Sequence, residues 1–161
     1  MRTKENLVNP ASDYYLYQPS TIASRLYLYP KEIGYFYYEP GYWRSRIQYN
    51  SFLLMYIAKG TCQVLLPNQQ LQNAAAGQVV LIDCYVPHEY GFDSNSEVAW
   101  IHFDGPLARD FYDLIFASHG NIISPSNPFP ITNGLDQMLH VFRNSKPLKE
   151  GEASEMITQM L

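Results

Sequence analysis

The most informative part of the chain reads Gly77-Gln-Val-Val-Leu-Ile-Asp-Cys-Tyr-Val-Pro-His-Glu-Tyr-Gly91 and, a few residues later, Ala99-Trp-Ile-His-Phe-Asp-Gly105. A glycine opens a short apolar strand, a Pro-His pair ends it, and a second apolar strand follows after a polar turn. This punctuation is typical of a small double-stranded β-helix barrel. We therefore expect a mostly β fold with C-terminal α structure, in which two or three amphipathic helices follow the barrel.

Strand-like segments fill the chain from Ile22 to Phe103. They are rich in tyrosine, phenylalanine and β-branched residues, and turn-forming residues separate them. Short strands at this spacing favour a sandwich or barrel over βαβ units. The expected strands are 25–29, 34–38, 44–49, 52–59, 62–66, 71–75, 79–82 and 97–103.

The two ends of the chain differ from this central part. Pro10 and Pro19 bracket the apolar segment Tyr14–Tyr17 and prevent a long regular element there. In the last third, apolar residues recur at helical spacing. The predicted division is an N-terminal arm over 1–20, a barrel over 21–105 and a helical region over 106–161.

The composition of the 161 residues narrows the class of protein. With 47% hydrophobic residues, the chain is globular and not disordered. A net charge of −4 argues against this segment gripping nucleic acid, because phosphate binding needs a basic surface. The sequence has no apolar run of the about 20 residues that a membrane span needs, and no signal peptide is visible. We expect a cytoplasmic protein, no contact with a membrane, and reduced thiols at Cys62 and Cys84.

The order of these signals resembles the N-terminal effector-binding and dimerisation domain of AraC-family bacterial transcription regulators, which is a cupin-like barrel. The resemblance covers about residues 14–161, and its most specific parts are Gly77…Pro87-His88 and Trp100-Ile-His-Phe-Asp-Gly105. It implies a regulator that responds to a sugar or another small polar effector. Regulators of this layout bind DNA through a C-terminal domain with two helix-turn-helix motifs. We expect that domain to lie outside this chain and DNA binding to belong to it.

Metal chemistry is not expected. A metal site in a cupin barrel needs a His-x-His pair and a carboxylate on one strand, and another histidine on a later strand. His88 matches the later position, but residues 44–52 contain neither histidine nor carboxylate. The chain also lacks a Gly-x-Ser-x-Gly elbow and a phosphate-binding glycine loop. We therefore expect no metal, no cofactor, no catalytic residue and no enzyme activity. A metal-dependent cupin enzyme is the alternative.

A run of alternating polar residues is the first candidate for a ligand pocket. Arg44, Arg46 and Gln48 share one face of an expected strand. Either that face meets solvent, or at least one guanidinium points inward and offers its planar fork to a sugar hydroxyl pair or a carboxylate. The resemblance implies that one of the two arginines contacts the effector.

Aromatic residues are the second candidate, because the apolar faces of a sugar ring pack well on aromatic faces. The resemblance places Tyr90 and Trp100 against such a ring, and His102 shares the strand face of Trp100. For each of these residues, the other interpretation is that the side chain packs in the barrel core and contacts no ligand. A barrel filled by its own side chains would be a ligand-free dimerisation module. The ligand-binding candidates are Arg46, Arg44, Tyr90, Trp100, His88, His102, Tyr56 and Tyr37.

The helical region carries two apolar stripes. They must pack on the barrel or on a partner chain, and the resemblance implies a homodimer through these C-terminal helices. The sequence alone leaves both arrangements open. The stripes are Leu135, Met138, Leu139 and Phe142, and then Ala153, Met156, Ile157, Met160 and Leu161.

Overall fold

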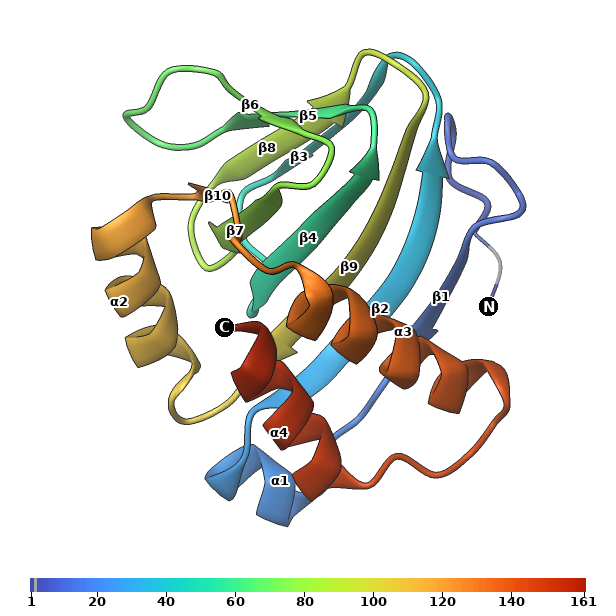
Figure 1. The fold of residues 1–161 in the computed structure, drawn as a ribbon, viewed down its shortest axis with the longest axis vertical. Helices are drawn as coiled ribbons and strands as arrows, with labels where there is room; N and C mark the ends of the chain where they lie inside the picture. Colours follow the sequence, from blue (N-terminus) through green and yellow to red (C-terminus); the bar gives the residue numbers. More distant parts are fainter. Residues whose placement is uncertain (2) are drawn as a thin grey trace.

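Two antiparallel sheets face each other in the computed structural model, which describes residue 1 and residues 3–161 (Figure 1). The larger sheet has the order β1-β2-β9-β4-β7-β10, and the smaller has the order β3-β8-β5-β6. The expected mostly β fold with C-terminal helices is confirmed. The strands are β1 (Asp13–Leu16), β2 (Tyr29–Tyr38), β3 (Tyr42–Arg46), β4 (Phe52–Lys59), β5 (Thr61–Leu65), β6 (Gln72–Ala75), β7 (Val79–Asp83), β8 (His88–Phe92), β9 (Ser96–Asp104) and β10 (Ile122–Ile123).

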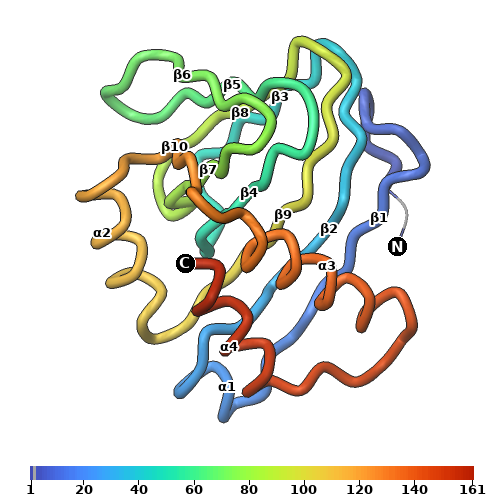
Figure 2. The backbone as a smooth tube through the Cα atoms, viewed as in Figure 1, coloured from blue at the N-terminus to red at the C-terminus, as the bar shows by residue number. Residues whose placement is uncertain are grey.

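Helices cover the outer face of the larger sheet. The chain from α3 to α4 crosses in front of β2 and β9, and α2 lies at the side (Figures 1 and 2). Within the described residues, none of the helices is long and apolar enough to cross a membrane. The helices are α1 (Thr21–Leu26), α2 (Ala108–His119), α3 (Phe129–Arg143) and α4 (Glu150–Met160).

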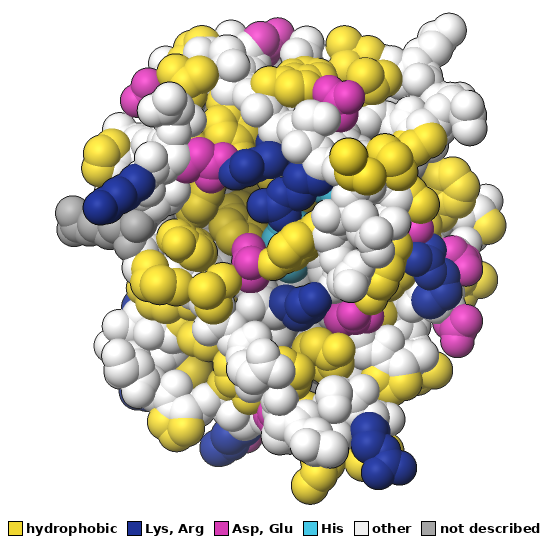
Figure 3. Space-filling model, turned by 180° about the vertical axis from the view of Figure 1, so that it is seen from behind, with side chains coloured by type: hydrophobic (Ala, Val, Ile, Leu, Met, Phe, Trp, Pro, Cys, Tyr) yellow, Lys and Arg dark blue, Asp and Glu magenta, His cyan; other side chains and the backbone are white. Residues whose placement is uncertain are grey.

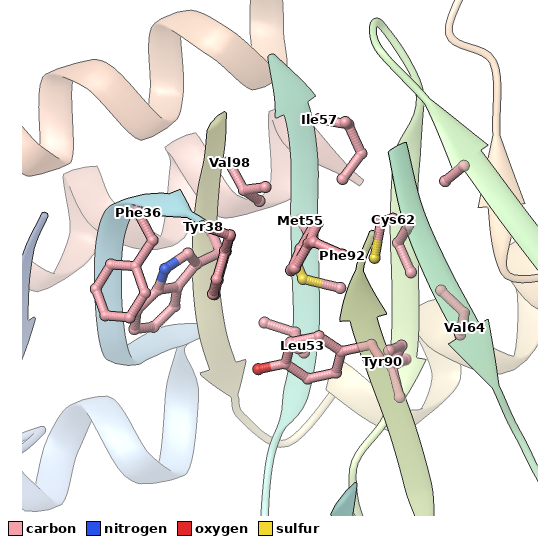
Figure 4. Close-up of a cluster of buried hydrophobic side chains, with 14 of the residues drawn as sticks. Phe36, Tyr38, Leu53, Met55, Ile57, Cys62, Val64, Tyr90, Phe92 and Val98 are labelled. Carbon is pink, nitrogen blue, oxygen red and sulfur yellow. The ribbon is translucent and has the colours of Figure 1, made fainter. Parts of the chain in front are cut away.

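The alternation of side chains along each strand builds two separate cores. In β4, Leu53, Met55 and Ile57 point into the space between the sheets, as Figure 4 shows for this cluster. Phe52 and Leu54, one step out of phase, point to the outer face under the helices. A strand buried on both faces has a continuous apolar sequence, which explains the unbroken run over residues 52–58.

Several elements differ from expectation, and three of them lie in the first 50 residues. Residues 25–29 were expected as a strand, but Thr21–Leu26 form α1, because the Ser20 hydroxyl accepts a hydrogen bond from the amide of Ala23 and caps a helix there. The arm contains β1, which pairs with β2. The strand expected over 44–49 ends at Arg46, so Gln48 does not continue the arginine face and lies exposed.

The apolar stripes of the helical region pack within the chain. Met138 and Leu139 of α3 and Ile157 of α4 are at most 2% exposed, and they join the core on the outer face of the larger sheet. Phe142 stacks on Tyr15 of β1, with ring centroids 5.7 Å apart. Of the two arrangements that the sequence left open, the structure adopts intramolecular packing. Most stripe residues are therefore buried within the chain, while Phe142, Met156 and Leu161 are half-buried.

Candidate ligand-binding site

A cavity of about 310 Å³ lies between the sheets, on the face opposite to the one that α3 and α4 cover. Figure 3 shows this face: basic side chains gather around a hollow, with acidic side chains beside them and a histidine deeper in. The walls come from the N-terminal segment and from β1, β2, β3, β8 and β9. The lining residues are Thr3, Glu5, Tyr14, Leu16, Glu32, Phe36, Tyr38, Tyr42, Arg44, Arg46, Tyr90, Trp100 and His102.

Five of the eight candidates predicted from the sequence meet in this cavity: Arg44, Arg46, Tyr90, Trp100 and His102. Antiparallel pairing of β3 with β8 sets Arg44 opposite Tyr90, and alternation along β9 gives Trp100 and His102 the same face. The sequence left undecided whether the arginines of this strand face solvent or the interior. In the structure, both arginines of β3 line the cavity.

Trp100 owes its position to a glycine on the neighbouring strand. Gly34 of β2 pairs with Trp100 of β9, and a Cβ at Gly34 would lie 2.5 Å from Cζ2 of the indole ring. Any larger residue there would push the ring away. The indole N–H of Trp100 is buried and has no hydrogen-bond partner among the described residues. A buried donor left unpaired costs free energy, so an acceptor on a ligand would stabilise it.

Arg44 is neutralised by the arm. Its guanidinium forms an ion pair with Glu5, and its Nε donates a hydrogen bond of 3.2 Å to the Tyr42 hydroxyl. That hydroxyl in turn donates to Glu5 Oε1 at 2.7 Å. Burial, followed by the nearby Tyr90 and Glu5, raises the pKa of Tyr42, so the phenol stays protonated and remains a donor. These three residues close one side of the cavity.

Arg46 has a different environment. Its guanidinium carbon lies 4.5 Å from the ring centroid of Tyr49, a cation–π contact. The Tyr49 hydroxyl donates a hydrogen bond to Glu32, and burial followed by this bond raises the pKa of the Tyr49 phenol. Within residues 1 and 3–161, Arg46 has no ion pair and no hydrogen bond through its side chain.

His102 is neutral. Its Nδ1 lies 2.9 Å from the hydroxyl of Ser51, and the side chain is 4% exposed. Burial lowers the pKa of His102 well below the usual range for histidine, and the charge of Arg46 lowers it further. Burial also raises the pKa of Tyr90 to about 12, so this phenol is protonated too. Both side chains therefore act as neutral hydrogen-bonding groups at the cavity wall.

His88 is buried beside this cavity and does not line it. Its Nδ1 lies 2.8 Å from the carbonyl oxygen of Val86, while its Nε2 is buried without a partner among the residues described. It borders a neighbouring hollow of about 450 Å³, which shares Arg46 with the first cavity. In the described part of the chain, no three histidine, cysteine or acidic side chains are grouped as metal ligands would be.

Two candidates lie on the wrong face for this cavity. Tyr37 and Tyr56 are one step out of phase with the inward residues of β2 and β4. They line a separate hollow of about 290 Å³ between the outer face of the sheet and α3. The structure therefore places these two candidates apart from the arginines. Their aromatic character was the same as that of the inward Phe36 and Tyr38, so only the strand phase could separate them.

Several cavity residues were not predicted from the sequence. Glu5 and Tyr14 come from the arm, which was expected to be irregular but apolar enough to dock. Glu32 of β2 and Tyr42 of β3 lie just outside the strand ranges 34–38 and 44–49 that the sequence predicted. The one sequence signal for them was the density of tyrosine and carboxylate around the expected strands. That signal does not say which of these side chains turn inward.

The chain matches the family model described as the AraC-like ligand binding domain over residues 29–161. No curated protein sequence matches the chain.

Similar solved structures include a cupin superfamily protein from Desulfitobacterium hafniense (14% identity, 63% of this chain and 82% of that one, TM-score 0.44). A cupin 2 conserved barrel domain protein from Leptotrichia buccalis is 16% identical over 64% of this chain and 43% of that one, with a TM-score of 0.47. An HTH_3 family transcriptional regulator from Vibrio cholerae is 13% identical over 60% and 52% of the two chains, with a TM-score of 0.44.

Proposed function

The chain belongs to the family of AraC-like ligand-binding domains, and from this we propose that it is the effector-sensing domain of a bacterial transcription regulator that responds to a sugar. The observation that carries the proposal is the cavity itself. It combines aromatic walls with an unpaired indole N–H at Trp100 and an unpaired guanidinium at Arg46. Polar groups of this kind fix the orientation of a small polar ligand in a largely apolar pocket.

The chemistry of the walls suits a polyhydroxylated molecule. Sugar hydroxyls both donate and accept hydrogen bonds, and the cavity offers both kinds of partner. Trp100 and Arg46 donate, Glu32 accepts, and the Tyr90 hydroxyl does either. The rings of Phe36 and Trp100, which meet edge to face at 5.1 Å between centroids, offer apolar surface to a pyranose face.

We propose a binding role and no catalytic role. The regulator would act in the cytoplasm as a homodimer, and a separate domain of the full regulator would bind DNA. Support for these points is the family and the acidic charge of this chain. A metal-dependent cupin enzyme remains the alternative, and a metal that copurifies in stoichiometric amount would favour it.

The first prediction tests for a ligand. A thermal-shift screen of monosaccharides and disaccharides should find at least one compound that raises the melting temperature. At a hundredfold excess over Kd, the free energy of unfolding rises by about 2.7 kcal/mol, which for a domain of this size shifts the midpoint by about 5–10 °C.

Fluorescence locates the binding site. The chain has two tryptophans, and Trp43 is 44% exposed outside the cavity, where its Nε1 donates to Glu89. In a Trp43→Phe variant, emission comes from Trp100 alone and should change when the same compound binds. A compound that raises the melting temperature without affecting this emission binds elsewhere. If no sugar produces either signal, the ligand-free dimerisation module becomes the better interpretation.

A further inference from the structure

Arg46 is the cavity's cation without a counter-charge. The other arginine, Arg44, is already paired with Glu5. The second carboxylate of the cavity, Glu32, accepts a hydrogen bond from the Tyr49 hydroxyl and is not within ion-pair distance of Arg46. Tyr49 stands between them, because its ring face contacts Arg46 while its hydroxyl contacts Glu32. Thus neither cavity carboxylate neutralises this guanidinium.

Among the described residues, no other carboxylate is within ion-pair distance of Arg46; Glu89, which borders the neighbouring hollow, accepts a hydrogen bond from Nε1 of Trp43 instead. Burial lowers the pKa of His88 and of His102, and the charge of Arg46 lowers both further, so both side chains are neutral near pH 7. Lys31 adds a second cation: its ammonium lies 5.6 Å from the centroid of the same Tyr49 ring, and it donates to the backbone carbonyl of Asn50. This spot is therefore positive in a chain whose net charge is −4.

A partly buried guanidinium without a partner favours an anion. Arginine presents its N–H groups in a planar fork that matches a carboxylate, and pairs of this kind are stronger than hydrogen bonds between neutral groups. A neutral hydroxyl pair would leave the charge uncompensated. An inward arginine could bind either a sugar hydroxyl pair or a carboxylate, and the geometry around Arg46 favours the carboxylate.

We propose that the ligand is a sugar acid of monosaccharide size whose carboxylate pairs with Arg46, an inference that rests on the proposed sugar-sensing function of the cavity. The volume of about 310 Å³ is at the low end of the about 300–1,000 Å³ typical of ligand pockets, so one ring fits better than a chain of several. The carboxylate meets Arg46, and the ring lies toward Trp100, where a hydroxyl accepts the free indole N–H.

The test compares matched pairs of ligands by isothermal titration calorimetry. D-Glucuronate, D-galacturonate, D-mannuronate and L-guluronate are each measured against the corresponding neutral hexose. The wild-type chain should bind at least one acid about 10- to 100-fold more tightly than its neutral partner, as expected for a charged hydrogen-bonded pair. In Arg46→Gln this preference should fall to near one, and Arg46→Lys should retain part of it.

The control variant is Arg25→Gln, which removes one positive charge from an exposed position on α1, outside the cavity lining. It should keep the full preference. The melting temperature of Arg46→Gln without ligand shows whether the variant is folded, and Arg46→Lys supplies a second folded variant if it is not.

Three results would overturn the inference. Neutral hexoses that bind as tightly as the acids would exclude the carboxylate, yet leave the proposed sugar-sensing function standing. A preference for acids that survives in Arg46→Gln would assign the carboxylate to another side chain. If none of the four acids binds, the sugar acid is excluded, and the sugar-sensing function falls only if the neutral sugars fail as well.

Discussion

Burial of His102 links the stability of the protein to pH. The side chain lies on the inner face of β9, and its Nδ1 lies 2.9 Å from the Ser51 hydroxyl. Protonation would put a second positive charge near Arg46 in a region of low dielectric constant, which is why the folded chain resists it. In the unfolded chain the same imidazole has an ordinary pKa of about 6.5.

We expect the free energy of unfolding to fall as pH is lowered from about 7 to 5. Below about pH 6.5 the unfolded chain binds a proton at His102 that the folded chain does not bind, so acid favours unfolding. The loss is at most about 1.4 kcal/mol per pH unit for one such histidine. The pKa of His88 is lowered in the same direction and adds to the slope. Urea denaturation at a series of pH values measures this dependence of the free energy of unfolding on pH.

A His102→Gln variant separates this effect from other titrations. Glutamine keeps a polar group near Ser51 but does not titrate, so the slope between pH 6 and 5 should become shallower. Gln137→Ala, an exposed position on α3 that carries no titrating group, is the control and should leave the slope unchanged. An unchanged slope in His102→Gln would mean that His102 is accessible to protons in the folded state.

Local alternation explains why sequence candidates line the cavity in pairs. Arg44 shares a strand face with Arg46, and Trp100 with His102, because the members of each pair are two residues apart on one strand. The partners that fix their charge lie far away in the sequence: Glu5 is 39 residues from Arg44, and Ser51 is 51 residues from His102. No local pattern contains that information.

At the scale of elements, α3 is part of the barrel's fold. Its buried face meets the outer face of β2 and β9 and the neighbouring α4. Gly134 allows the close approach of α4, since a Cβ there would lie 3.0 Å from Sδ of Met160. On the same helix, the side chain of Met138 is fully buried in the core on the outer face of the sheet. The helix therefore stabilises the sheet from outside, while the cavity lies on the sheet's other face.

Met138→Ala should lower the free energy of unfolding by about 2–5 kcal/mol, because it removes a buried side chain and leaves a cavity. Gln137→Ala, at the adjacent exposed position, should change it by no more than about 0.5 kcal/mol. In urea, far-ultraviolet circular dichroism and the fluorescence of Trp100 in the Trp43→Phe background should report one transition. Two transitions would show that the helices unfold independently of the barrel.

The elements that were missed had weak local signals. α1 is six residues long and its helical pattern is set by the Ser20 cap, so the aromatic residues beyond it favoured a strand. β8 begins at His88, where the Pro-His pair was interpreted as the end of a strand. It forms because both β3 and β5 pair with it, which is a long-range cause. The long apolar strands and the three later helices needed no such partner to be recognised.

At the scale of the whole molecule, the helical region buries the residues that were expected to face a partner. What remains outward is a smaller set: Leu107 is 56% exposed just before α2, Leu114 is 69% and Phe116 41% exposed on α2, and Phe129 is 65% exposed at the start of α3. Ile115 of α2 and Ile131 of α3 both border one hollow of about 260 Å³, together with residues of β4 and β7. If the proposed homodimer forms through the helices, this is the apolar surface that it can use.

The last prediction follows from that exposure. Sedimentation at micromolar concentration should show a dimer, and Leu114→Glu should shift it toward monomer while the melting temperature stays within a few degrees, since the side chain is mostly in solvent. Leu139→Glu should instead unfold the domain, because a carboxylate would be buried under α3. Ile22→Glu, 63% exposed on α1, is the control and should leave the dimer intact. A monomer at every concentration would refute the homodimer for this chain, and a dimer that persists in Leu114→Glu would place its interface on another surface.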